Sequence, residues 1–469
     1  MIKSNGGIIG PDNVTTGGAF GTASGVFKLG EVTNLIKDSK WPTAGPQGFQ
    51  VANSVRLNAG DNPSMAVTQG TPTNVDKYTF SVWVKRADVG AANSKIFSVT
   101  SGSATGEEKL EFNQDDLIWR QTDTSGDINW QRVTDRVFRD SSAWYHIVVA
   151  YDSSQGTAGN RCKMYINGVQ ETSFSASPDP ASGANSYTNT SGRSLKFFAL
   201  HSNLNSQNNG GYFSEMVYVD GQQLAPTSFG EFNSQTGIWV PKDISGLTFG
   251  NNGFYCEFKN SGALGADTSG NSNNLSVTNI TSTDQSTDTC STNFATMNAL
   301  GGYGTFSEGN LKFVTSTTDG QWGTSTISLS SGGKWYCEVK MIATASKYQI
   351  GVTNNNAQEF TYRVVYRSDG YIYVGGSSTS GYTTYTTNDI IGMAFDSSNR
   401  EITFYKNGSF VGTVTAPALA SSVPQDYFFG ATALSSGTLT TEWNYGSPPF
   451  AISSGNTDGN GFGNFEYAV

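Results

Sequence analysis

The chain has 469 residues, of which 14% are charged and 12% aromatic, and it contains 55 glycines. The aromatic content suffices for buried cores, which excludes a disordered chain, and so much glycine disfavours long helices. The formal charge of −10 excludes a nucleic-acid partner, because phosphate binding needs a basic surface. We therefore expect an all-β protein with room for two or three domains.

The N-terminus lacks the long apolar run of a signal peptide, and no stretch approaches the roughly 18 apolar residues of a membrane helix. We expect synthesis in a cytoplasm and no membrane insertion. Three cysteines, Cys162, Cys256 and Cys337, alternate in phase with apolar residues, which is typical of free buried thiols. No Cys-x-x-Cys pair occurs, so no zinc or redox site is predicted.

Residues 1–48 are rich in Gly and Thr and hold too few apolar residues for a core. We expect an irregular N-terminal arm that attaches the protein to a neighbouring subunit. The expected attachment residues are Val26, Phe27, Leu29, Trp41 and Pro42. Simple packing on the adjacent domain is the alternative.

Residues 49–260 predict a first β-sandwich, because many short strand-like segments are separated by turn signals. Within it, an alternating strand at 144–152 is followed by a polar turn and a second strand that ends in Asn167-Gly168. Asn-Gly favours a type I′ turn, because both residues tolerate positive φ. The acidic stretch at 107–111, with Asp115 and Asp116, is interpreted as solvated turn charge beside a strand.

Residues 261–305 form a Ser/Thr/Asn-rich stretch that we interpret as a polar connector. Its segment 267–274 alternates oxygen-bearing side chains around a glycine but lacks the terminal Glu of an EF-hand loop. The favoured interpretation is an Asx-rich turn without metal, and the alternative is a calcium ion near Asp267 and Asn271. We predict no other cofactor and no metal.

Residues 306–450 predict a second β-sandwich, which repeats the hairpin motif of the first. Ala394-Phe395-Asp396 corresponds to Ala150-Tyr151-Asp152, and the second strand ends in Asn407-Gly408. Residues 451–469 form a Gly/Asn-rich tail whose aromatic residues suggest that it docks. Two jelly-roll sandwiches in tandem are therefore expected.

Four tyrosines lie close together near loops of the second sandwich. Tyrosine offers a flat apolar face and a hydroxyl, which suits a sugar. A ligand site is therefore predicted at Tyr371, Tyr373, Tyr382 and Tyr385. The alternative is that these rings pack at an interface.

No catalytic constellation is apparent. His146 lies in an expected strand and His201 at the end of another, where packing or exposure is far commoner than a role as a base. The Glu-x-Asp-x-x-Glu signature of glucanases is absent, as is a Gly-x-Ser-x-Gly elbow. We predict that the protein is not an enzyme.

Three resemblances carry a functional expectation. The segment 144–152 with Met164-Tyr165-Ile166-Asn167-Gly168 resembles laminin-G-like, concanavalin-A-like jelly rolls. Residues 333–339, 350–352, 389–396 and 404–408 together resemble a SPRY domain. The start, Gly6 to Pro11 with 23–29 and Trp41-Pro42, is similar to the opening of virion structural proteins of tailed bacteriophages.

These resemblances imply a non-enzymatic virion protein of tail- or head-fibre type, located on the virion surface, whose lectin-like domains adhere to host-surface glycans. The implied partners are other virion proteins, reached through residues 1–48, and host glycans. A homo-oligomer, taken as a trimer, is expected. The alternatives are an architectural head-decoration or collar subunit without a ligand and, below it, a glycan depolymerase.

Overall fold

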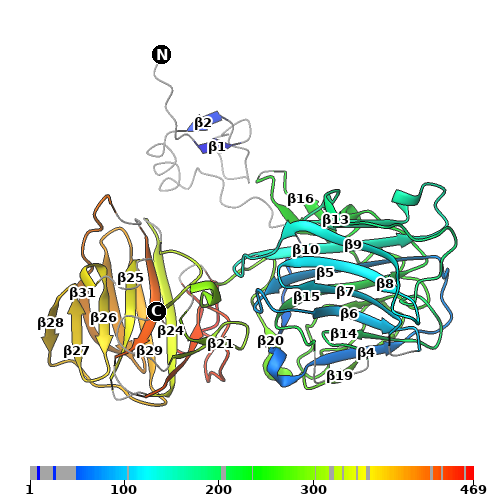
Figure 1. Ribbon diagram of the computed structural model, residues 1–469. Coiled ribbons are helices and arrows are strands. Elements are labelled where there is room, and N and C mark those ends of the chain that lie inside the picture. Colours follow the sequence, from blue (N-terminus) through cyan, green and yellow to red (C-terminus); the bar gives the residue numbers. More distant parts are fainter. Residues whose placement is uncertain are drawn as a thin grey trace.

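The computed structural model describes residues 8–10, 25–27, 49–102, 105–201, 207–234, 236–301, 303–315, 322–329, 332–344, 347–354, 360–422, 426–434, 437–458 and 461–468. These residues contain strands and short 3-10 turns but no α-helix. Figure 1 shows two β-sandwiches side by side. The prediction of an all-β fold with two sandwiches in tandem is confirmed.

The first sandwich consists of two eight-stranded antiparallel sheets. One sheet has the order β12-β11-β10-β5-β15-β3-β20, with β18 also paired to β15. Its strands are β12 (Val169–Gln170), β11 (Cys162–Ile166), β10 (Trp144–Asp152), β5 (Lys77–Arg86), β15 (Gly211–Asp220), β3 (Ser54–Leu57), β20 (Gln285–Ser286) and β18 (Phe254–Cys256).

The facing sheet has the order β13-β9-β8-β7-β6-β14-β4-β19. Its strands are β13 (Phe174–Ala176), β9 (Ile128–Val137), β8 (Asp116–Thr122), β7 (Glu107–Asn113), β6 (Ser94–Thr100), β14 (Ser194–Phe197), β4 (Ser64–Thr68) and β19 (Ser276–Thr278). Large aromatic rings fill the space between the two sheets. Tyr78 stacks on Tyr151 at 5.6 Å between centroids, and Trp119 packs edge-on against Trp130 at 4.8 Å.

The second sandwich consists of a seven-stranded and a six-stranded antiparallel sheet. The first of these is β21 (Thr305–Ser307), β22 (Lys312–Thr315), β33 (Leu439–Asn444), β24 (Lys334–Ala343), β29 (Ile390–Asp396), β30 (Glu401–Lys406) and β31 (Ser409–Thr415). The other is β23 (Gly323–Thr324), β32 (Tyr427–Ala433), β25 (Tyr348–Asn354), β26 (Val364–Arg367), β27 (Tyr371–Val374) and β28 (Ser377–Ser380). Buried Cys337, Trp443 and Phe404 belong to the core between these sheets.

Smaller elements complete the chain. The strand pair β1 (Ile8–Gly10) and β2 (Gly25–Phe27) lies in the expected N-terminal arm, and β16 (Gly230–Phe232) pairs with β17 (Trp239–Pro241). The 3-10 turns are η1 (Ala59–Asp61), η2 (Ala158–Asn160), η3 (Pro226–Ser228), η4 (Ser282–Asp284), η5 (Ala299–Gly301) and η6 (Phe360–Tyr362). Leu29, Trp41 and Pro42 lie outside the described residues, and attachment through residues 1–48 stays a prediction.

The two repeated hairpins end in the same turn. Asn167 and Gly168 have φ of +48° and +78°, and Asn407 and Gly408 have φ of +47° and +77°. Positive φ at both central residues is the geometry of a type I′ turn. Each asparagine side chain also accepts a hydrogen bond from the first strand of its hairpin, from His146 N at 2.7 Å and from Ile390 N at 2.8 Å.

The interpretation of 261–305 as a connector needs correction. Strands β19 and β20 of this stretch pair with β4 and β3 of the first sandwich. Leu264, Leu275 and Ile280 are buried in the first core. These apolar residues are isolated in a polar stretch, so the sequence shows no strand or helix periodicity there. The first sandwich therefore extends well beyond residue 260.

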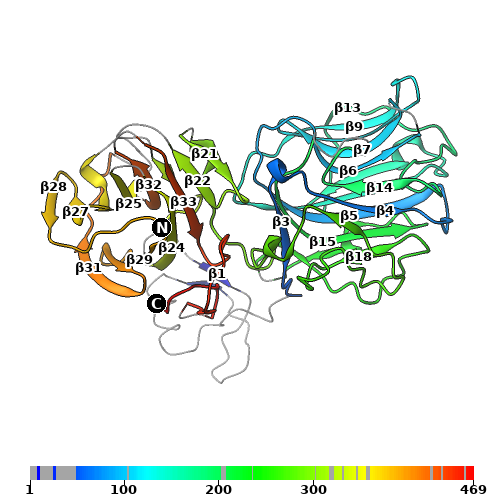
Figure 2. The ribbon, with the colours of Figure 1, turned by 90° about the horizontal axis from the view of Figure 1, so that it is seen from below.

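The two sandwiches meet in an interface with buried polar groups, and β21 lies on the side of the second sandwich that faces the first in both views, with β22 beside it in Figure 2 (Figures 1 and 2). On the side of the first sandwich, the fully buried Lys85 Nζ donates to Asp288 Oδ2 at 2.7 Å, and Trp144 Nε1 donates to Asp288 Oδ1 at 3.1 Å. Across the interface, Tyr212 Oη donates to the Gly309 carbonyl at 2.9 Å. The halves are therefore docked through specific contacts.

Candidate ligand pocket

The C-terminal tail covers part of the outer face of the seven-stranded sheet. In β24, Tyr336 and Glu338 point outward beneath the tail, opposite the core residues Cys337 and Val339. The Glu338 carboxylate accepts hydrogen bonds from the backbone N–H groups of Glu466 at 2.9 Å and of Tyr467 at 2.8 Å. Burial beneath these groups raises the pKa of Glu338.

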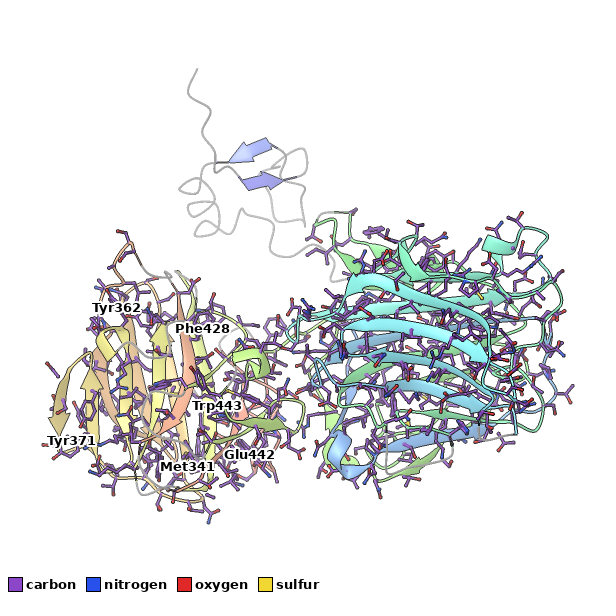
Figure 3. All side chains as sticks on the ribbon, in the orientation of Figure 1. Met341, Tyr362, Tyr371, Phe428, Glu442 and Trp443 are labelled. Atoms are coloured by element: carbon purple, nitrogen blue, oxygen red, sulfur yellow. The ribbon has the colours of Figure 1, made fainter. Side chains whose placement is uncertain are left out.

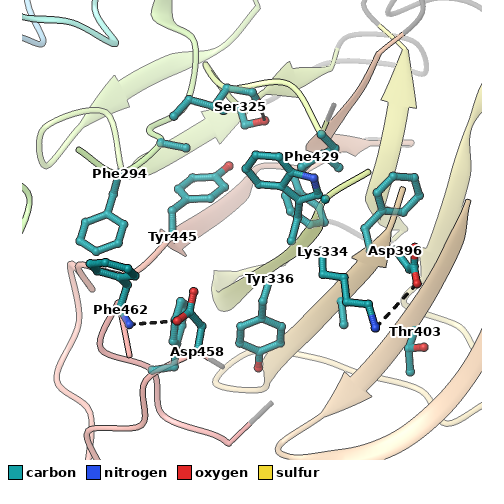
Figure 4. A pocket seen from close by; sticks show the side chains of 18 of the residues that line it. Phe294, Ser325, Lys334, Tyr336, Asp396, Thr403, Phe429, Tyr445, Asp458 and Phe462 are labelled. Carbon is teal, nitrogen blue, oxygen red and sulfur yellow. Dashed lines mark hydrogen bonds and ion pairs between the residues drawn. The ribbon is translucent and has the colours of Figure 1, made fainter. Parts of the chain in front are cut away.

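A pocket of about 940 Å³ opens beside this tail (Figure 4). Three separate parts of the chain line it: residues 293–295 from the stretch between β20 and β21, the ends of strands in the second sandwich, and the tail. The lining residues are Asn293, Phe294, Ala295, Ser325, Ile327, Leu329, Gly333, Lys334, Trp335, Tyr336, Ala394, Phe395, Asp396, Glu401, Thr403, Phe429, Tyr445, Asp458, Phe462 and Phe465. The pocket therefore exists only when all three parts are folded together.

Aromatic rings form much of the pocket wall. Phe294, Trp335 and Tyr336 are half-buried, and Phe462 of the tail is 50% exposed. Figure 4 shows the rings of Phe294 and Phe462 next to each other, on the opposite side of Tyr336 from Lys334. Aromatic faces that remain open to solvent can pack against the apolar face of a ligand ring.

Charged groups lie at the rim of the same pocket. Lys334 Nζ is 3.9 Å from Asp396 Oδ2, and its side chain is 86% exposed. Glu401 is exposed, and Asp458 Oδ1 accepts a hydrogen bond from Phe462 N at 2.9 Å. Three carboxylates against one lysine leave the lining with a net formal charge of −2.

Buried groups of the first sandwich hold one wall of the pocket. Lys85 Nζ donates to Asn293 Oδ1 at 2.8 Å and to the Phe294 carbonyl at 2.6 Å. The same lysine pairs with Asp288, so one buried cation fixes the strand end of β5 and the pocket wall together. Lys85 is thus a positioning residue for Phe294.

None of the four tyrosines predicted to bind a ligand lines this pocket. Tyr371 and Tyr373 are half-buried on the outer face of β27, where each ring lies 4.8 Å from the Arg367 guanidinium. Figure 3 shows Tyr371 at the end of the second sandwich that is far from the first. Ile372, between them, is buried in the core.

Tyr385 is placed differently from the prediction. It is only 3% exposed, and its hydroxyl donates to the Tyr366 carbonyl at 2.8 Å. Tyr382 is half-buried and packs against the same core. Tyr385 cannot offer a ring face to a ligand, because its ring is buried in the core. The Gly-rich sequence before it did not indicate that the chain returns into the core there.

His146 is a buried structural residue. Its ring is stacked between Trp83 and Trp239, at centroid distances of 4.7 and 5.9 Å. Trp239 Nε1 donates to His146 Nδ1 at 2.9 Å, which leaves the proton on Nε2, 2.8 Å from Ser81 Oγ. Burial lowers the pKa of His146 to about 3, so the ring is neutral.

The acidic stretch at 107–111 is also placed differently from its interpretation as solvated turn charge. It forms β7, in which Glu108 is fully buried and accepts hydrogen bonds from Tyr78 and Ser186. On the other face, Lys109 Nζ lies 3.2 Å from Glu107 and 3.0 Å from Glu111. The buried Lys95 also pairs with Glu111. Alternation along a strand, with lysines supplied by β6 and β7, explains the burial.

The Asp267 carboxylate organises a turn. It accepts hydrogen bonds from Tyr255 N at 2.9 Å and from Ser269 N and Asn273 N, each at 2.8 Å. Asn271 Nδ2 donates to the carbonyls of Gly250 and Gly253. Within the described parts of the chain, no group of three or more His, Cys, Asp or Glu side chains is arranged to hold a metal ion.

The sequence contained several pocket residues without indicating that they meet. Gly333 to Tyr336 and the hairpin at Asp396 carried the resemblance to SPRY domains, and the aromatic tail was expected to dock. What brings Phe294 to them is the interface with the first sandwich, which depends on Lys85. No local signal could show that distant contact.

Among the described residues no helix is long and apolar enough to cross a membrane.

No protein with a curated description matches the chain. Among solved structures, the SPRY domain of human HERC1 has 17% identity and a TM-score of 0.24, covering 28% of this chain and 87% of that one. A SAP-like pentraxin from Limulus polyphemus has 15% identity and a TM-score of 0.29, covering 38% and 80%. Domains LG4-5 of the mouse laminin alpha1 chain have 9% identity and a TM-score of 0.30, covering 85% and 89%.

Two family descriptions match separate parts of the chain. Residues 59–205 match the Concanavalin A-like lectin/glucanases superfamily, in its Laminin_G_3 form. Residues 334–439 match the SPRY domain. The chain therefore carries a laminin-G-like, concanavalin A-like domain followed by a SPRY domain.

Proposed function

We propose that this protein binds glycans without catalysing a reaction on them, and that the pocket of the SPRY domain is a glycan site. The observation that carries the proposal is an open cleft of about 940 Å³ with half-buried aromatic rings on its wall and carboxylates, an ammonium and a hydroxyl on its rim. A sugar ring needs a flat apolar surface for its CH face and polar partners for its hydroxyls.

The superfamily description of the first domain names lectins together with glucanases, so it supports binding to glycans but does not by itself separate binding from hydrolysis. Three groups there that could act as acids or bases are engaged in packing and pairing. His146 has both ring nitrogens in hydrogen bonds, and Glu107 and Glu111 are each paired with lysines. A binding role thus fits the described residues better than a depolymerase.

The test compares two exposed phenylalanines. Phe462 lines the pocket, whereas Phe410 lies on β31, is 66% exposed and does not line it. Phe462→Ala should weaken oligosaccharide binding about tenfold, because one ring contact is lost, and Phe410→Ala should leave binding unchanged. A glycan array followed by calorimetry on the best ligand measures both.

If no glycan binds, the architectural alternative replaces this proposal. If polysaccharide is hydrolysed by the wild-type protein, the depolymerase alternative does. Equal losses in Phe462→Ala and Phe410→Ala would place the site elsewhere.

We propose further that the protein is a structural protein of a tailed-phage virion that uses this binding for host adhesion, as a homo-oligomer attached through residues 1–48. The support is the resemblance of Gly6 to Pro11, 23–29 and Trp41-Pro42 to virion proteins. A chain lacking residues 1–48 should fold and bind glycan but be absent from purified particles. Normal incorporation of that chain would refute attachment through this segment.

A further inference from the structure

The repeated hairpins carry opposite charges at matching positions. In the first sandwich, Asp152 on β10 lies opposite Lys77 on β5, and its backbone N–H bonds to the carbonyl of Arg161 just before β11. In the second, Asp396 on β29 lies opposite Lys334 on β24 and opposite Glu401 on β30. The position held by a cation in the first hairpin is therefore held by an anion in the second.

The second arrangement is less well compensated. Lys77 Nζ lies 3.3 Å from Asp152 and is 31% exposed, whereas Lys334 Nζ lies 3.9 Å from Asp396 and is 86% exposed. An exposed pair at that distance contributes little. Like charges directly opposite each other on paired strands are destabilising, and this repulsion between Asp396 and Glu401 opposes the hydrogen bonds that Asp396 Oδ1 accepts from Ser398 N at 2.9 Å and from Asn399 N at 3.2 Å.

Both carboxylates face the pocket. Asp396, Glu401 and Thr403 line it, and Glu401 is the strand partner of Asp396. Figure 4 shows Asp396 and Thr403 at the same end as Lys334. Among the described residues, the Glu401 carboxylate makes no ion pair or hydrogen bond. An exposed carboxylate beside a second one, at the mouth of an aromatic cleft, is complementary to a cation attached to a ring.

We propose that the pocket prefers glycans whose sugars carry a free ammonium group, with the ring against the aromatic wall and the ammonium between Asp396 and Glu401. This rests on the glycan-binding function proposed above and names its ligand class. A sugar is favoured over a lysine side chain, because the half-buried rings of Trp335 and Tyr336 line the same pocket as the two carboxylates and offer flat apolar faces. Lys334 extends into solvent and can leave Asp396 when the ligand arrives.

The test uses two probes of equal length: a glucosamine tetramer with free amino groups and an N-acetylglucosamine tetramer. Calorimetry is done near pH 6, where the amines are largely charged. The free-amine tetramer should bind the wild-type protein about five- to tenfold more tightly than the acetylated one, the gain expected from one or two ion pairs. Glu401→Gln should reduce that preference to within about twofold while leaving the acetylated tetramer unaffected. Glu231→Gln, an exposed carboxylate outside the pocket, is the matched control.

The outcomes separate this inference from the function on which it rests. If the acetylated tetramer binds as well or better, or Glu401→Gln changes nothing, the ammonium preference is wrong and glycan binding stands. If neither tetramer binds but another oligosaccharide of the array does, the ammonium preference fails and glycan binding stands; if no glycan of the array binds, both fail. If a lysine-rich peptide binds more tightly than the free-amine tetramer, the pocket belongs to protein ligands and the inference is overturned.

Discussion

The hairpins that end at Gly168 and at Gly408 have the same backbone turn but different covers. Gly168 lies under Trp239, a buried residue of the β16–β17 hairpin that also bonds to His146. Gly408 lies under Tyr467, a half-buried residue of the C-terminal tail that is held through Glu338. A local sequence thus specifies the turn, while distant parts of the chain decide whether its cover is a rigid part of the core or a docked tail.

The largest expected difference lies in how the groups that hold the two covers respond to acid: His146 bonds to Trp239, and Glu338 bonds to the backbone of Tyr467. The pKa of His146 is lowered to about 3 from 6.5, so the unfolded chain takes up a proton before the folded one does. Stability from this group is present above about pH 6.5 and is lost as the pH falls, at about 1.4 kcal/mol per unit and about 5 kcal/mol in full. The pKa of Glu338 is raised, so its contribution is present at low pH and is lost as the pH rises through that pKa.

Denaturant titrations from pH 7 to pH 4.5 measure this contrast. The wild-type protein should lose about 3 kcal/mol more than His146→Gln over that range, and Glu338→Gln should change the slope in the opposite sense. Parallel pH profiles for wild type and His146→Gln would mean that His146 can be protonated in the folded state.

Alanine at the two glycines should reveal the rigidity of each cover. A Cβ at Gly168 would lie 2.2 Å from Cε3 of Trp239, and one at Gly408 would lie 2.7 Å from Cδ1 of Tyr467. Positive φ costs about 1–2 kcal/mol at either site, and the fixed indole adds a packing cost. We expect Gly168→Ala to destabilise by about 4 kcal/mol in urea unfolding, and Gly408→Ala by about 2–3 kcal/mol, because the tail ring can shift and adds only about 1 kcal/mol. Equal losses would contradict the distinction between core and tail.

A smaller effect is expected from the contact between position 408 and the ring of Tyr467. In a chain that already carries Tyr467→Ala, Gly408→Ala should cost about 1 kcal/mol less than in the wild type, because the ring it would strike is gone. Additive losses in this double-mutant cycle would show that Tyr467 does not cover the turn. Phe410→Ala, on the adjacent strand, serves as the control background.

The turns and both sandwiches could be predicted because their signals are local: Asn-Gly pairs, alternation and repeated motifs. The placement of 261–305 could not, because isolated Leu264, Leu275 and Ile280 in a polar stretch show no period. A site at Tyr385 was predicted wrongly, because the burial of its ring depends on a return of the chain into the core that no neighbouring residue indicates. The pocket needed Phe294, the strand ends and the tail to meet, and contacts such as Lys85 to Phe294 leave no trace in neighbouring residues.

The most direct test of a glycan site in this pocket is to locate a bound glycan on the protein. A photoreactive derivative of the best oligosaccharide would be crosslinked to the full chain, and the labelled peptides identified by mass spectrometry. We expect labels on peptides that contain Phe294, Tyr336 or Phe462, which line the pocket. Labels confined to Tyr371 and Tyr373, or to the first sandwich, would contradict it.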